Sequence, residues 1–153
     1  MEHFFAYGTL QPGSNLKYFE QNDLSKYLFP KGKGTVRGEL LHLRNTKLNI
    51  EYPAMIKSND ESKQVHGTLY EVRAPEEAFK IMDMHELYTT EPNTNVLKKI
   101  DLYERMDVLV ECGGDTISAR AYALNQNSEF LKSGVVEVLG SVPSGDWLKH
   151  IGH

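Results

Sequence analysis

The chain has 153 residues, with 17 Lys and Arg against 21 Asp and Glu, which gives a formal net charge of -4. This length favours a single domain over residues 1–153, and it is sufficient to bury a sizeable apolar core. The charge argues against a general nucleic-acid-binding protein, because such proteins are usually basic. The single cysteine, Cys112, excludes an internal disulfide and a multi-cysteine metal site.

The N-terminal half is predicted to be rich in strands. The aromatic run His3–Tyr7 ends at Gly8, a pattern typical of a buried strand rather than of a signal peptide. Gly8–Ser14 contains two glycines and a proline and is predicted to be a loop. A short helix is expected at Asn15–Asn22. Further strands are expected at Thr35–Leu43, at Val65–Val72 and, because a proline favours a sheet edge, at Tyr52–Lys57.

The C-terminal half is predicted to contain a helix and a hairpin. Pro75 suits the first position of a helix over Pro75–Glu86. Strands at Met106–Cys112 and Ile117–Leu124 flank the turn-forming residues 113–116. The order of the predicted strands and helices along the chain lacks the regular strand–helix alternation of a parallel sheet. It predicts an α+β fold with a mostly antiparallel or mixed sheet, closed or nearly closed, and a few helices.

The distribution of apolar residues indicates whether the chain spans a membrane and where the protein is expected. No apolar run approaches the roughly 20 residues that a membrane-spanning helix needs. We therefore expect a cytoplasmic protein with no membrane partner. The sequence leaves the oligomeric state open, since no heptad or exposed helical stripe indicates a dimer.

Glu86 is the first candidate for chemistry. It lies seven residues after Phe79 and four after Met82, so on a helix it shares their apolar face. Apolar surroundings and the negative end of a helix dipole both raise the pKa of a carboxyl group. Such a group can accept and return a proton near neutral pH. On position alone, a salt-bridged or exposed glutamate beyond the helix end is the more common alternative.

The loop after the first strand is the second candidate. A sharp turn after a strand can direct successive backbone N–H groups into one concavity that binds a carboxylate, and Gly8 permits such backbone conformations. A plain turn is the alternative. Cys112 is expected to be an inert thiol rather than a nucleophile. His150 and His153 have a spacing that can contact a metal, but they lie at the chain end, so no metal site is predicted.

Six segments, in chain order, together resemble the γ-glutamylcyclotransferase-like family. The first is Phe-Phe-Ala-Tyr-Gly-Thr-Leu followed by Pro-Gly, and the fourth is Met-Asp-Met-His-Glu, which resembles the family motif that ends in its catalytic glutamate. The six segments are Phe4–Leu10 with Pro12–Gly13, Tyr52–Met55, Val65–Val72, Met82–Glu86, Tyr103–Arg105 with Val108 and Val110, and Ser144–Trp147.

The resemblance implies a small mixed, mostly antiparallel β-barrel with flanking helices. It implies conversion of a γ-glutamyl amide to 5-oxoproline and a free amine, without a metal or an organic cofactor. Glu86 is then the expected catalytic acid/base. The expected substrate-binding residues are Tyr7, Gly8, Thr9, Leu10 and Tyr103.

Three departures from the family pattern concern the substrate. Gln11 stands where the family often has Arg, Leu87 stands where Gly is frequent, and Tyr88–Asp101 is longer than is common. The leaving amine is therefore not determined by the sequence. The main alternative is a non-catalytic module that binds a carboxylate or an amino acid on the same barrel, and a Cys112-dependent hydrolase is a more distant one.

Overall fold

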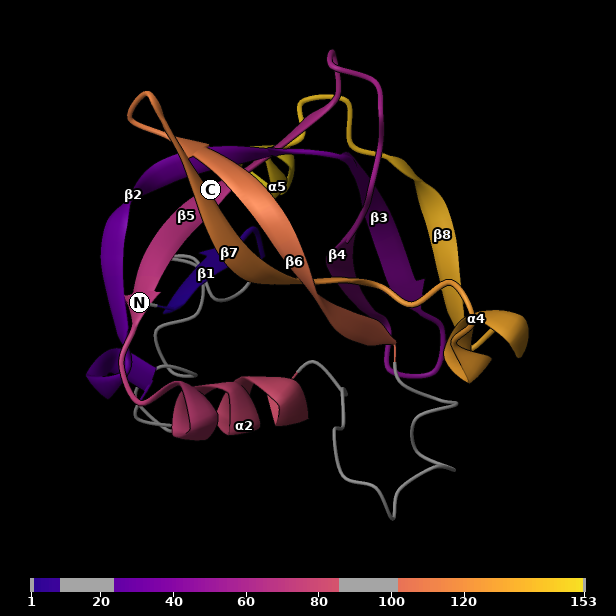
Figure 1. The fold of residues 1–153 in the computed structure, drawn as a ribbon. Helices are drawn as coiled ribbons and strands as arrows, with labels where there is room; N and C mark the ends of the chain where they lie inside the picture. Colours follow the sequence, from indigo (N-terminus) through magenta and orange to yellow (C-terminus); the bar gives the residue numbers. More distant parts are fainter. Residues whose placement is uncertain (1, 9–23, 86–101, 153) are drawn as a thin grey trace.

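A closed barrel forms the body of the protein (Figure 1). The computed structural model describes residues 2–8, 24–85 and 102–152. Within these ranges β1 and β7 pair in parallel, whereas the other barrel neighbours pair antiparallel. The prediction of a small mixed, mostly antiparallel barrel is confirmed. Its strands, in spatial order, are β1 (Glu2–Ala6), β5 (Gln64–Val72), β2 (Leu28–Arg37), β6 (Tyr103–Cys112) and β7 (Asp115–Leu124).

A second, three-stranded antiparallel sheet lies beside the barrel. Its central strand is β3 (Glu39–Asn45), between β4 (Ile50–Ile56) and β8 (Val136–Ser141). The predicted edge strand at Tyr52–Lys57 corresponds to β4, which is at an edge of this sheet. The sequence analysis missed β8. Only its first residue is buried, so it lacks the apolar alternation that indicates a half-buried strand.

Gly38 separates the barrel from the second sheet. The sequence analysis treated Thr35–Leu43 as one strand, and this prediction is wrong at Gly38, where β2 ends and β3 begins. A Cβ atom on Gly38 would lie 2.8 Å from the carbonyl oxygen of Ile56, closer than real Cβ atoms approach. The chain therefore changes sheets at the one residue type that fits there.

The β6–β7 hairpin has a turn of two residues. Gly113 and Gly114 have φ values of +59° and +88°, which glycine adopts without strain. Cys112 pairs directly with Asp115 across this turn. The hairpin is confirmed, although β6 begins at Tyr103 and β7 at Asp115, before the predicted starts of both strands.

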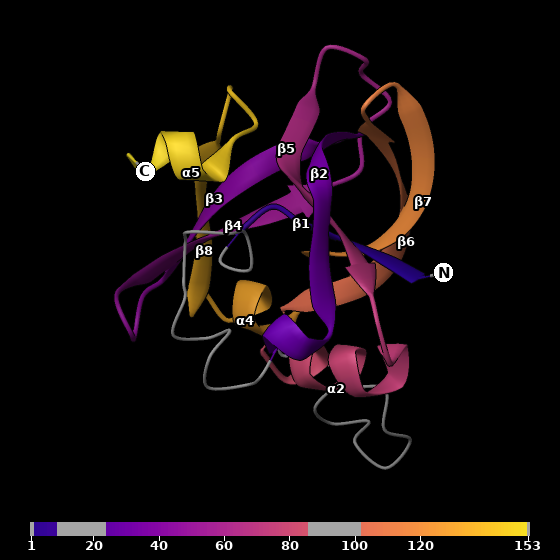
Figure 2. The same cartoon turned by 90° about the vertical axis from the view of Figure 1, so that its left-hand side faces the viewer.

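The longest described helix, α2 (Pro75–His85), lies at one end of the barrel in both views (Figures 1 and 2). Its start agrees with the prediction, whereas Glu86 lies outside the described residues, as do the predicted helix at Asn15–Asn22 and the loop after Gly8. None of the described helices is long and apolar enough to cross a membrane. The short helices are η1 (Leu24–Lys26), α4 (Glu129–Lys132) and α5 (Trp147–His150).

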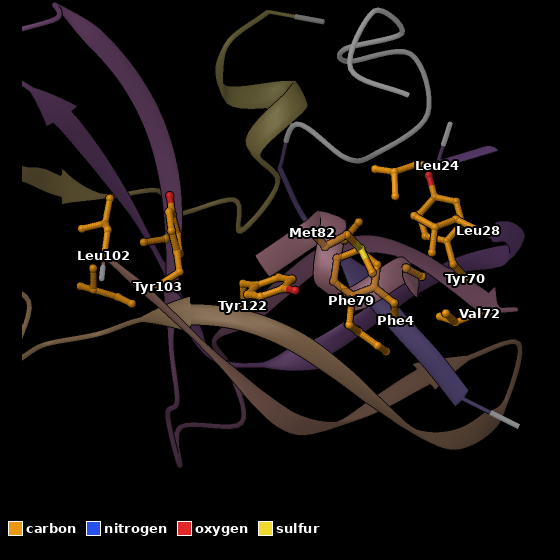
Figure 3. Close-up of a cluster of buried hydrophobic side chains, with 14 of the residues drawn as sticks. Phe4, Leu24, Leu28, Tyr70, Val72, Phe79, Met82, Leu102, Tyr103 and Tyr122 are labelled. Atoms are coloured by element: carbon orange, nitrogen blue, oxygen red, sulfur yellow. The ribbon is translucent and has the colours of Figure 1, made fainter. Parts of the chain in front are cut away.

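Two clusters of buried side chains stabilise this arrangement. Side chains alternate between the two faces of a strand. In β1, accordingly, Phe4 packs in one cluster and Phe5 in the other. Figure 3 shows the first cluster, in which Phe79 and Met82 of α2 lie against Phe4. Apolar burial therefore holds α2 on the barrel.

Candidate active site

Tyr7 links the end of β1 to two other strands. Its side chain is buried, and its hydroxyl accepts a hydrogen bond from the backbone N–H of Met55 at 3.1 Å. The same hydroxyl donates to the carbonyl oxygen of Tyr122. Tyr7, which directly precedes Gly8, therefore ties β1 to β4 and to β7.

Gly8 passes close to β4. A Cβ atom on Gly8 would lie 2.9 Å from Cγ of Pro53, a distance that real Cβ atoms essentially never show. Glycine at this position therefore lets the chain approach the proline. Two segments of the family resemblance, Phe4–Leu10 and Tyr52–Met55, therefore touch at Gly8 and Pro53.

Tyr103 contacts the same part of β4 from β6. Its hydroxyl donates to the carbonyl oxygen of Pro53 at 2.5 Å, and its ring packs edge-on against Tyr52 with the ring centroids 6.5 Å apart. The three described candidate site residues, Tyr7, Gly8 and Tyr103, thus converge on residues 53–55. Thr9, Leu10 and Glu86 lie outside the described residues, so their place at this site stays a prediction.

A buried carboxylate that the sequence analysis did not single out lies near the end of α2. Asp83 accepts hydrogen bonds from Arg105 Nη1, at 3.1 Å to each carboxylate oxygen, and from the hydroxyl of Tyr122. The guanidinium carbon of Arg105 also lies 4.7 Å from the ring centroid of Phe79. The spacing argument applied to Glu86 also applies to Asp83, which is four residues after Phe79.

A family comparison adds evidence that the geometry does not supply. The model of the family described as gamma-glutamyl cyclotransferase, AIG2-like, matches residues 4–149. The chain belongs to this family. The comparison with curated proteins gives no match. The match to the gamma-glutamyl cyclotransferase family includes the segments around Tyr7, Tyr103 and Glu86, and it confirms the resemblance inferred from them.

Solved structures share the fold of this gamma-glutamyl cyclotransferase family member at low identity. YkqA from Bacillus subtilis aligns with a TM-score of 0.62 and 17% identity, over 97% of this chain and 40% of YkqA. An AIG2-like protein from Mus musculus aligns with a TM-score of 0.55 and 22% identity, over 80% of this chain and 76% of that one. A structure described as gamma-glutamyl cyclotransferase aligns with a TM-score of 0.55 and 15% identity, over 81% of this chain and 66% of that one. The chain thus spans less than half the length of YkqA.

Cys112 and the C-terminal histidines are the other residues that the sequence analysis considered. Cys112 is half-buried at the end of β6, where its Sγ would lie 3.3 Å from a Cβ atom on Gly32. His150 Nε2 lies 3.0 Å from Nδ1 of His42, whose Nε2 lies 2.7 Å from Glu51 Oε1. His153 lies outside the described residues. Among the described residues, no group of three or more metal-ligating side chains is arranged to hold a metal ion.

Replacing Tyr7 with phenylalanine is expected to lower the free energy of unfolding by about 1–3 kcal/mol, since the buried N–H of Met55 loses its partner. Urea unfolding measures the change. Tyr52→Phe is the matched control, because Tyr52 is only half-buried and packs through its ring, and we expect a change within about 0.5 kcal/mol. Equal stabilities of the two variants would contradict a structural role for the Tyr7 hydroxyl.

Proposed function

We propose that this protein is a γ-glutamyl cyclotransferase that acts on a small γ-glutamyl amide. The α-amine of the substrate attacks its own γ-carbonyl carbon, so a carbon–nitrogen bond forms and closes a five-membered ring. The γ-amide bond breaks, and the proton lost by the α-amine is returned to the departing nitrogen. The products are 5-oxoproline and a free amine. The family match over residues 4–149 carries this proposal.

Glu86 has the role of general acid/base in this proposal. It removes the proton from the attacking amine and then protonates the leaving amine. Because the nucleophile and the carbonyl belong to one molecule, holding the substrate in a folded conformation supplies much of the acceleration. The reaction therefore requires one carboxylate and a rigid anchor, and no metal or organic cofactor.

The backbone at Gly8, Thr9 and Leu10 is the proposed anchor for the substrate α-carboxylate, through N–H groups directed into one concavity. The convergence of Tyr7, Gly8 and Tyr103 on residues 53–55 supports this proposal. The Tyr7 hydroxyl bonds to backbone groups of β4 and β7, so it holds the residue directly before Gly8 in place. A stiff anchor loses less conformational entropy when the substrate binds.

The proposal is tested by incubating the protein with γ-glutamyl amino acids, γ-glutamyl amines and glutathione, and by measuring 5-oxoproline by mass spectrometry. At least one substrate is expected to yield 5-oxoproline and its amine in equal amounts. The α-linked isomer of that substrate and its N-acetylated form are the controls. Neither presents a free α-amine to a γ-amide carbonyl, so neither should react.

If no compound in the panel yields 5-oxoproline, the protein is not a cyclotransferase for these substrate classes. Calorimetric binding of the same compounds without turnover would instead identify a non-catalytic binding module.

A further inference from the structure

Asp83 is a buried charged group that the proposed reaction does not use. It lies on α2, and its side chain is only 9% exposed. A buried carboxylate is costly unless it is paired and hydrogen-bonded. Asp83 meets both conditions through Arg105 and Tyr122, which donate to it from β6 and β7.

The two donors form a clamp with a defined geometry. Arg105 and Tyr122 are direct cross-strand partners in the β6–β7 ladder, so they approach the carboxylate together. Apolar contacts of Phe79 and Met82 hold α2 on the barrel, but such contacts are non-directional. The hydrogen bonds to Asp83 are directional, and they therefore define how the last turn of α2 is rotated and how far along the barrel it lies.

Tyr122 also connects α2 to the other half of the proposed site. Its side-chain hydroxyl donates to Asp83, while its backbone carbonyl accepts from the hydroxyl of Tyr7. Tyr7 precedes the Gly8 loop, and Asp83 precedes Glu86 by three residues. Tyr122 of β7 is thus bonded both to the helix that leads to Glu86 and to Tyr7, the residue directly before Gly8.

We propose that Asp83, through Arg105 and Tyr122, is a positioning residue that fixes the last turn of α2, the helix that leads to Glu86 in the sequence. The proposal rests on the proposed function of Glu86 as the acid/base. Glu86 follows directly after His85, the last residue of α2, so the placement of the helix end constrains where the chain continues. A displacement of about 1 Å at a reacting group can lower the rate about 100-fold.

Asp83→Asn tests this role, because asparagine keeps the shape of the side chain and removes its charge. We expect kcat to fall about 10- to 100-fold, with KM nearly unchanged, in protein that circular dichroism shows to be fully folded. Tyr122→Phe removes one donor but keeps the backbone carbonyl that Tyr7 requires. It is expected to lower kcat in the same direction by a smaller factor, and it carries the test if Asp83→Asn does not fold.

Asp107→Asn is the matched control. Like Asp83, Asp107 is an aspartate with an arginine nearby. It lies on β6, its side chain is 86% exposed, and its carboxylate is 3.9 Å from Arg120 Nε. We expect its kcat to equal that of the wild type. Wild-type kcat in folded Asp83→Asn and Tyr122→Phe, with Glu86→Gln inactive, would overturn the positioning role and leave the proposed function intact. Wild-type kcat in Glu86→Gln would instead overturn the acid/base role on which both depend.

Discussion

Glu86→Gln is expected to lower kcat for γ-glutamyl cyclisation by about 100- to 10,000-fold, the range typical of a lost general acid or base. Glutamine has nearly the same size and can still form hydrogen bonds, but its neutral amide does not accept the proton of the attacking amine. Because we propose that the Gly8–Leu10 backbone binds the substrate, KM should change little. Steady-state kinetics with 5-oxoproline as the measured product separates the two parameters.

The control for Glu86→Gln is the same substitution at Glu77. Glu77 is exposed in the first turn of α2, so Glu77→Gln removes a carboxylate from the same helix without altering a buried contact. Its kcat should equal the wild-type value. A further check is the pH profile of kcat/KM, because protonation of a carboxylate that acts as the catalytic base produces a fall in rate at acid pH. Retention of wild-type kcat by Glu86→Gln would remove Glu86 from the mechanism.

Gly145 lies in the C-terminal tail, the residues that follow β8. Gly145→Ala is expected to produce the largest loss of stability among single substitutions in this tail. Gly145 has a φ of +68°, and a non-glycine residue in this left-handed region costs about 1–2 kcal/mol. A Cβ atom there would lie 1.8 Å from the carbonyl oxygen of Gln64, so the tail must move away from β5. Overpacking of this kind adds about 1–3 kcal/mol.

The displacement would also affect contacts beyond the glycine. The carbonyl oxygen of Gly145 accepts a hydrogen bond from the N–H of His66 at 2.8 Å, and the buried Trp147 follows two residues later. Gly134→Ala is the control, since Gly134 has a φ of +79° but no atom near the position of the added Cβ. Urea unfolding should show a clearly larger loss for Gly145→Ala. Equal losses for both variants would show that the contact with Gln64 does not constrain the tail.

Local signals in the sequence predicted the elements that depend on neighbouring residues. Pro75 indicated the start of α2, and the two glycines after Cys112 indicated the β6–β7 turn, because helix starts and tight turns depend on the backbone preferences of a few consecutive residues. The structure contains both. The break at Gly38 was missed, since the close approach of Ile56 that requires glycine there comes from another strand.

Part of the candidate site was likewise predictable from local sequence, and part was not. The motifs that carry Tyr7, Glu86 and Tyr103 were readable in the sequence, and the family match confirms the resemblance that they suggested. The roles of Thr9, Leu10 and Glu86 remain predictions. Asp83 was overlooked because Arg105 and Tyr122, which donate hydrogen bonds to it, lie 22 and 39 residues later in the chain, and no spacing rule connects them to it.

The sequence by itself therefore determined the family, the type of barrel, the main helix and the hairpin turn, because these depend on residue order and on local backbone preferences. Only the tertiary structure decided which strands receive the tyrosine hydroxyls and which groups surround Asp83. Tyr7 reaches Met55 over 48 residues and Tyr103 reaches Pro53 over 50 residues. Such contacts depend on barrel closure and strand register, which arise from the packing of the whole chain.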